Sequence, residues 1–100
     1  MEDSEKIKQF ILRSLMKKGK FGGAHTPVDN ITHQLPDEVL NDKKGQKSIE
    51  KALKELVNLG WVLVMKKRTG KGSDLHISIN PRSIKEIHEY LVQAHTLKDI

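Results

Sequence analysis

The chain contains no cysteine, only four aromatic residues in 100, and no apolar run longer than Trp61 to Met65. Without cysteine it can form neither a disulfide nor a thiolate zinc site, which is typical of a reducing compartment. The apolar run is far shorter than the roughly 20 residues of a membrane-spanning helix. The segment Met1 to Ser4 also lacks the features of a signal peptide. We therefore expect a soluble, cytoplasmic protein without a membrane partner.

Length and apolar content predict one folded domain. One hundred residues are the usual size of a single domain, and 36% hydrophobic residues suffice for one thin core. We therefore treat residues 1–100 as one domain with a core over about 5–94. Eighteen Lys and Arg against thirteen Asp and Glu give a formal net charge of +5, an excess that attracts polyanions. The position of these charges on each element then decides what they mean.

The first helix is predicted over residues 5–18. Ser4 is suited to cap its start, and Gly19 stands where such a helix ends. The apolar residues recur at intervals of three and four, as on one face of a helix: Ile7, Phe10, Ile11 and Leu15. The glycine-containing segment 20–24 that follows is expected to be a loop or a single edge strand.

Two further helices are predicted before residue 60. Thr26-Pro27 combines a capping hydroxyl with a ring whose φ is already helical, and it predicts a short helix over 27–34. Residues 36–43 begin with a proline and are expected to form an irregular turn or one helical turn. Apolar residues at helical spacing then predict a longer helix over 44–59.

A β-hairpin is predicted after Gly60, the glycine expected to end the helix over 44–59. Residues 61–65 are large and often β-branched, and residues 75–80 alternate apolar and polar side chains at period two. The segment 67–73 between them is polar, cationic and glycine-containing, which predicts a long-armed hairpin with a mobile basic tip.

A last helix is predicted after Asn80-Pro81, which repeats the cap-then-proline pattern, and it is expected to run to Val92 or Ala94 before residues 96–100 fray. The order helix, helix, helix, strand, strand, helix is typical of a winged helix. We therefore expect an α+β fold with a three-helix core that contains a helix-turn-helix, a β-hairpin wing and a C-terminal helix.

The predicted helix over 44–59 places lysines on one face, roughly opposite its apolar stripe: Lys44, Lys47, Lys51 and Lys54. Ammonium groups suit phosphate contacts better than base reading. Base contacts, if made, are expected from the first turns, where Gln46 suits adenine, Lys47 suits guanine and Ser48 lies beside them. The alternative is a solvated face on which a Glu50 to Lys54 pair stabilises the helix slightly.

The predicted wing adds a second basic element directly after this helix: Lys66, Lys67, Arg68 and Lys71. Such a tip can follow the DNA backbone or enter the minor groove, and Arg68 suits a narrow groove best. The alternative is a tip that charge keeps soluble. Because two basic elements follow one another, we expect double-stranded DNA as the partner and a role as a transcriptional regulator or chromatin-associated factor.

The segment from Gln46 to Val62 resembles the recognition helix and first wing strand of prokaryotic winged-helix regulators, with its leucine-glycine-apolar junction. Three further segments resemble a group of small archaeal winged-helix proteins of unassigned function: His25 to Ile31, Ile77 to Pro81, and Glu86-Ile87. The resemblance covers about residues 7–91. It implies the fold and a DNA-binding role, but neither a target sequence nor an effector.

The five histidines do not predict a metal site. His25 and His33 are eight residues apart and His88 and His95 are seven apart, so neither pair has ligand spacing on one helical face. His25, next to the expected cap at Thr26, is interpreted as making a local structural contact, and His88 as a residue at the edge of the core.

No catalytic residue or cofactor is predicted. Asp37, Glu38 and Asp42 are close in sequence, but no histidine partner or glycine-rich phosphate loop accompanies them. Trp61 alternates with Leu63 and Met65, which predicts a core position rather than a base-stacking one. We therefore expect a binding protein and not an enzyme.

Two other functions remain open, a winged-helix adaptor for protein contacts and an RNA-binding module. The scarcity of aromatic residues argues against a base-stacking RNA platform but not against one that reads duplex shape. A homodimer is expected to use the C-terminal helix, unless intramolecular packing covers its apolar residues: Ile84, Ile87, Leu91 and Val92.

Overall fold

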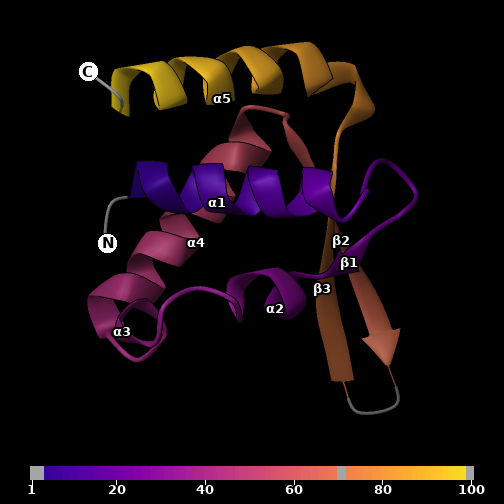
Figure 1. Ribbon diagram of the computed structural model, residues 1–100. Helices are drawn as coiled ribbons and strands as arrows, with labels where there is room; N and C mark the ends of the chain where they lie inside the picture. Colours follow the sequence, from indigo (N-terminus) through magenta and orange to yellow (C-terminus); the bar gives the residue numbers. More distant parts are fainter. Residues whose placement is uncertain (1–3, 70–71, 99–100) are drawn as a thin grey trace.

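The protein is a small α+β protein. A computed structural model describes residues 4–69 and 72–98, with the side chains of 67–69, 72–74 and 95–98 left out of the description. The elements are, in chain order, α1 (Ser4–Lys17), β1 (Thr26–Pro27), α2 (Val28–Thr32), α3 (Asp37–Leu40), α4 (Lys43–Asn58), β2 (Val62–Thr69), β3 (Gly72–Ile79), a 3-10 turn (Pro81–Ser83) and α5 (Ile84–Lys98). In Figure 1, α1 lies between α5 and α2, with α4 crossing behind it.

The sheet is antiparallel, with strand order β1-β3-β2. The hairpin of β2 and β3 pairs Val62 with Ile79 at its base and Thr69 with Gly72 at its outer end. The predicted hairpin is thus confirmed, but its strands are longer than the sequence indicated and extend into the segment expected to be the tip. Phe21 forms a further isolated bridge to Ile79, so the connector after α1 does contribute to the sheet edge.

One hydrophobic core joins the helices to the base of the hairpin. α1 and α4 each bury one stripe, as their apolar spacing predicts. The largest fully buried apolar side chains are Ile7, Ile11, Leu12, Leu15, Ile31, Leu56, Ile77, Ile79 and Ile87. α1 therefore has its inner side fixed against α2, α4 and β3.

Several local signals of the sequence are confirmed. Gly19 and Gly60 adopt φ values of +68° and +78°, the left-handed conformation in which glycine ends a helix without strain. Asn80 caps the turn that leads into α5, because its side chain accepts a hydrogen bond from the Arg82 amide. These signals act within a few residues, which is why the sequence alone indicates them.

The Thr26 cap is a wrong prediction. Thr26 pairs with Ile77 in the sheet, and α2 begins one residue after Pro27 without a side-chain cap. The Thr26 hydroxyl instead accepts a hydrogen bond from the side-chain amide of Asn30 at 3.4 Å. The helix is shorter than the expected 27–34, because pairing with β3 holds Pro27 extended and the helix gives way to a turn after Thr32.

The end of the last helix and the alternation in β2 also differ from expectation. α5 continues to Lys98, several residues beyond Ala94 and through part of the segment expected to fray. Trp61 is half-buried and packs against the core, but Leu63 and Met65 remain 41% and 42% exposed. Val62, opposite Ile79, is buried, but Val64 is as exposed as Leu63 and Met65, so β2 contributes to the core only at its base.

Candidate nucleic-acid interface

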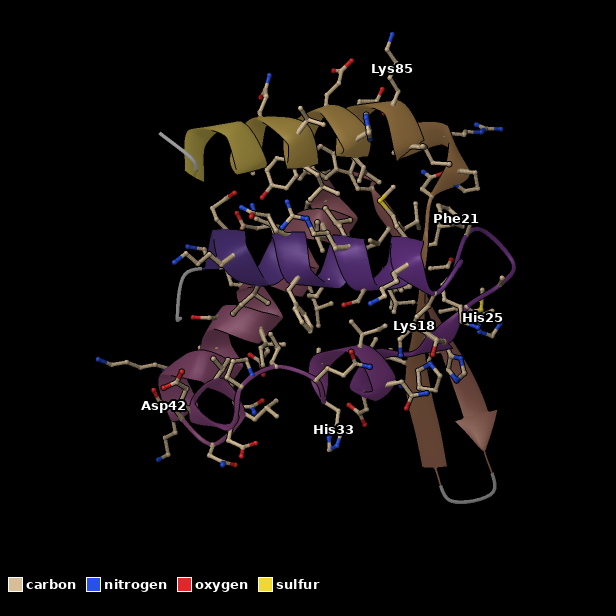
Figure 2. The ribbon with its side chains drawn as sticks, in the orientation of Figure 1. Lys18, Phe21, His25, His33, Asp42 and Lys85 are labelled. Atoms are coloured by element: carbon tan, nitrogen blue, oxygen red, sulfur yellow. The ribbon has the colours of Figure 1, made fainter. Side chains whose placement is uncertain are left out.

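The start of α4 is fixed by two local contacts. Asp42, labelled in Figure 2, accepts a hydrogen bond from the Lys44 amide as the N-cap of α4. Gly45 is buried against the backbone of Val39, so closely that a Cβ atom there would lie 2.0 Å from the Val39 carbonyl oxygen. The first turn of α4 is thus fixed by shape, and with it the direction in which the following side chains point.

The outer face of α4 carries the lysines that the sequence predicted. Ile49, Ala52 and Leu56 form the buried side, and the predicted lysines lie on the opposite side, all exposed: Lys44, Lys47, Lys51 and Lys54. Lys43, which the sequence analysis did not select, is exposed on the same side. We call these five residues the α4 lysine face.

The ammonium groups of the α4 lysine face are available to a ligand. Among the described residues, the ion pairs belong to Lys8, and none engages these five lysines. The Glu50 to Lys54 pair considered from the sequence is therefore absent from this described part of the chain. Flexible, hydrated ammonium groups in a row provide point charges for a row of phosphates.

Gln46 and Ser48 border the α4 lysine face, but each is engaged by another interaction. The Gln46 amide donates a hydrogen bond to the Leu40 carbonyl at the end of α3, about 100° around the helix from Lys47. Ser48 is half-buried and has an interaction of its own. The structure thus groups the lysines of α4 but not the two polar residues predicted to read bases with them.

Of the four basic side chains predicted on the hairpin, the structure describes one. Lys66 is exposed on β2 and pairs across the strands with Leu75. Lys67 and Arg68 belong to β2, but their side chains are outside the description, and Lys71 is outside the described residues. The basic wing of the sequence analysis is therefore represented in the structure by Lys66.

Sequence reasoning also missed a buried lysine on α1. Lys8 is 5% exposed and lies in the buried stripe of α1, where its ammonium contacts Glu5 and lies 3.6 Å from Glu55 Oε2. Two hydrogen bonds lower the pKa of the Glu5 carboxyl below its usual 4.5. The larger effect comes from Lys8, and the second comes from the Tyr90 hydroxyl, which donates to Glu5 at 2.6 Å. Its position between Ile7 and Ile11 was the available signal.

His25 makes a contact that is not local, contrary to expectation. Its Nδ1 lies 2.8 Å from Nδ1 of His76 on β3, and the two rings meet edge to face at a centroid distance of 4.8 Å. His88 is exposed on α5. Within the described residues, no three histidine or carboxylate side chains gather where they could bind a metal.

The candidate dimer surface of α5 is divided. Ile87 and Leu91 are buried in the core of the same chain, whereas Ile84 and Val92 are on the surface. Tyr90 packs its ring on Trp61 at a centroid distance of 5.1 Å, which further attaches α5 to its own chain. Two of the four residues expected at a dimer contact are therefore used in intramolecular packing.

No protein-family profile matches the chain, and no curated protein is significantly similar to it. Among the described residues, no helix is long and apolar enough to cross a membrane. The function is therefore inferred from the surfaces of the molecule.

Proposed function

We propose that the protein binds duplex DNA, with α4 docked in the major groove and the β2–β3 hairpin beside it on the backbone or minor groove. The α4 lysine face carries this proposal, because five exposed lysines project from a helix whose other side is fixed in the core. An α-helix fits the width of the major groove, and its lysines then lie near the phosphates that border the groove.

The order of the elements supports the proposal that this α+β fold is a winged helix. α1, β1, α2, α4, β2 and β3 follow one another in the order of that fold, and β3 lies between β1 and β2. The short α3 stands in the turn before α4, the helix that would be the recognition helix. This description agrees with the resemblance to small archaeal winged-helix proteins.

The surface chemistry favours affinity without strong sequence preference. Lysine contacts phosphates as a point charge, and the Gln46 amide is engaged by Leu40. The acidic residues at the start of α3 and α4 are exposed, and Asp42 serves as a helix cap. We therefore propose a binding role, as a chromatin-associated factor or a regulator, in preference to an enzymatic one.

The test is binding to a labelled duplex of random sequence across a salt series. We compare the natural protein with K47E/K51E and with R82E/K85E, a control that changes net charge equally at exposed positions outside the α4 lysine face. Lys85 points away from the body of the molecule on α5 (Figure 2). Binding by the natural protein should weaken with salt at a log–log slope of about −0.9 per phosphate contacted.

The two variants should differ clearly. K47E/K51E should bind at least about tenfold more weakly, with a salt slope shallower by about 1.8, because two phosphate contacts are lost. R82E/K85E should keep most of the affinity and the full slope. No binding at low salt would overturn the proposal and favour an adaptor role. Equal losses in both variants would overturn docking through α4 and favour a different nucleic-acid surface. Stronger competition by duplex RNA than by duplex DNA would favour RNA as the partner.

A further inference from the structure

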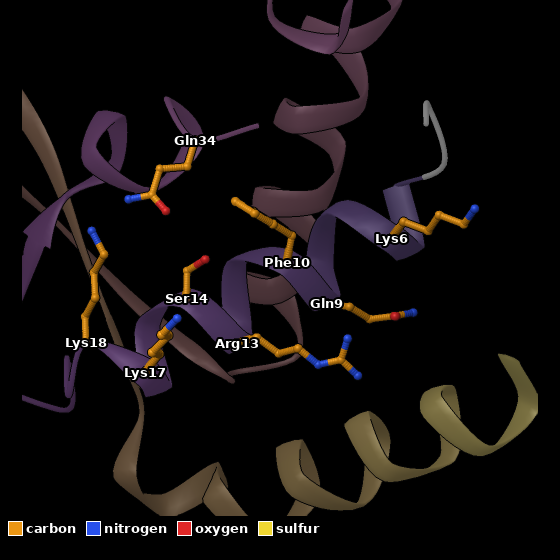
Figure 3. A pocket seen from close by; sticks show the side chains of 8 residues that line it. All are labelled: Lys6, Gln9, Phe10, Arg13, Ser14, Lys17, Lys18 and Gln34. Carbon is orange, nitrogen blue, oxygen red and sulfur yellow. The ribbon is translucent and has the colours of Figure 1, made fainter. Parts of the chain in front are cut away.

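A second basic surface lies on α1, on the side away from the core. It forms an open groove of about 370 Å³ between α1 and the residues that follow α2 (Figure 3). Its cations are Lys6, Arg13 and Lys17 on α1 and Lys18 just after it, and none of the described residues that line the groove is acidic. All four side chains are exposed, and none takes part in an ion pair within the described residues.

The helical period places these charges together. Ile7, Ile11 and Leu15 face the core, so positions 6, 13 and 17 lie on the opposite side of the helix. The neighbouring acid, Glu5, contacts Lys8 and Tyr90 instead. Over the part of α1 that the structure describes, the outer side is therefore cationic, and we call Lys6, Arg13, Lys17 and Lys18 the α1 basic groove.

The form of the α1 basic groove suits an extended polyanion. Along the helix, Lys6 and Arg13 are about 10 Å apart and Arg13 and Lys17 about 6 Å apart, at 1.5 Å per residue. That spacing distributes charge along a line, as the phosphates of a nucleic-acid strand do. The planar guanidinium of Arg13 can donate two parallel hydrogen bonds to one phosphate.

The other lining residues favour the backbone over the bases. Phe10 is half-buried and packs against the core, so its ring is not a free platform for base stacking. Ser14 and Gln34 add a hydroxyl and an amide at the same groove, which are groups that also contact phosphate and sugar oxygens (Figure 3).

We infer that a single straight duplex contacts only one of the two basic surfaces. α1 and α4 pack against each other through their apolar stripes, and α4 runs behind α1 in Figure 1. The α1 basic groove and the α4 lysine face are therefore on outer sides of a two-helix layer, in which each helix is about 10 Å across. The two surfaces are thus available to two separate segments of DNA.

We propose that the α1 basic groove binds the sugar-phosphate backbone of a second DNA duplex, so that one molecule bridges two duplexes. This inference rests on the proposed function, because the first duplex is the one on the α4 lysine face. Neither contact requires a specific sequence, which is consistent with a protein that brings distant DNA segments together.

The test is a capture assay with two duplexes, one carrying biotin and the other a fluorophore. Streptavidin beads should retain the fluorescent duplex only when the protein links it to the biotinylated one. R13E/K17E should reduce capture to the background without protein, while its affinity for an isolated duplex changes less than about threefold. R82E/K85E, with the same charge change, should capture like the natural protein.

The outcomes separate the two proposals. Normal binding of isolated duplexes without capture, or equal capture by R13E/K17E and the natural protein, overturns bridging through α1 and leaves the proposed function intact. Loss of isolated-duplex binding in R13E/K17E but not in K47E/K51E overturns both, because α1 is then the primary DNA surface. Unchanged circular dichroism and melting temperature would show that these exposed substitutions leave the fold intact.

Discussion

α1 and α4 are built alike but are fixed in the fold by different physical means. Each buries an apolar stripe against the other and presents cations outward. The first turn of α4 is held by close backbone contact, where Gly45 lies against Val39. The first turns of α1 are held by charge, where Lys8 contacts Glu5 and approaches Glu55. The start of α4 should therefore respond to added volume, and the start of α1 to changes of charge and pH.

The largest effect is expected from Gly45→Ala. The added Cβ would lie 2.0 Å from the carbonyl oxygen and 2.7 Å from the carbonyl carbon of Val39, so α3 or α4 must shift. We expect a loss of more than about 3 kcal/mol in the free energy of unfolding, the upper range for overpacked sites. Urea unfolding followed by the fluorescence of Trp61, the single tryptophan, measures it.

Gly23→Ala is the matched control for this substitution. Gly23 has no atom within 4 Å of a built Cβ, and its φ is not positive. The free energy of unfolding of Gly23→Ala should therefore differ from that of the natural protein by less than about 0.5 kcal/mol. Equal losses in the two variants would show that the contact between Gly45 and Val39 does not hold α4.

Much of this fold could be predicted from the sequence because its signals are local. The period of α1 and α4, the glycines that end them, and the cap at Asn80 each depend on residues a few positions apart. The lysines of α4 follow from the same period, since a helix with one apolar face must expose the other. The same helical period places the cations of α1 on one face, but the groove beside them is also lined by Gln34, which comes from another part of the chain.

What the sequence could not indicate depends on partners far along the chain. Thr26 has the chemistry of a helix cap, but pairing with Ile77 makes it a strand residue. His25 meets His76 only because β1 adds to β3. Gln46 has the chemistry to read a base, but the end of α3 accepts its amide hydrogen. For Thr26 and His25, local propensity was overridden by a contact that no short window contains. Gln46 is the exception, because the carbonyl that accepts its hydrogen bond is only six residues away and depends on where α3 ends.

The next largest effect is expected from Lys8→Glu. Its control is Lys54→Glu, which changes the net charge equally. The first places a carboxylate beside Glu5 and near Glu55 in a buried position. We expect a loss of about 2–3 kcal/mol, below the full cost of an isolated buried charge because both glutamates keep partial hydration. Lys54 is exposed, so Lys54→Glu should change the free energy of unfolding by less than about 0.5 kcal/mol while weakening DNA binding. Equal free energies of unfolding in the two variants would contradict the inference that the charge of Lys8 stabilises the fold because it is buried.

The smallest effect is the pH dependence at the start of α1. The pKa of Glu5 is lowered by its hydrogen bonds from Lys8 and Tyr90, so the folded state binds a proton at this carboxyl less readily than the unfolded chain does. The stability from this group is therefore fully present above the usual pKa of 4.5 and is lost as the pH falls through the lowered value. Glu5→Gln removes the titrating group and should be less stable than the natural protein at pH 7, with the difference shrinking in acid. Unfolding free energies measured from neutral to acidic pH check this, and a difference that stays constant throughout would assign the effect to packing rather than to charge.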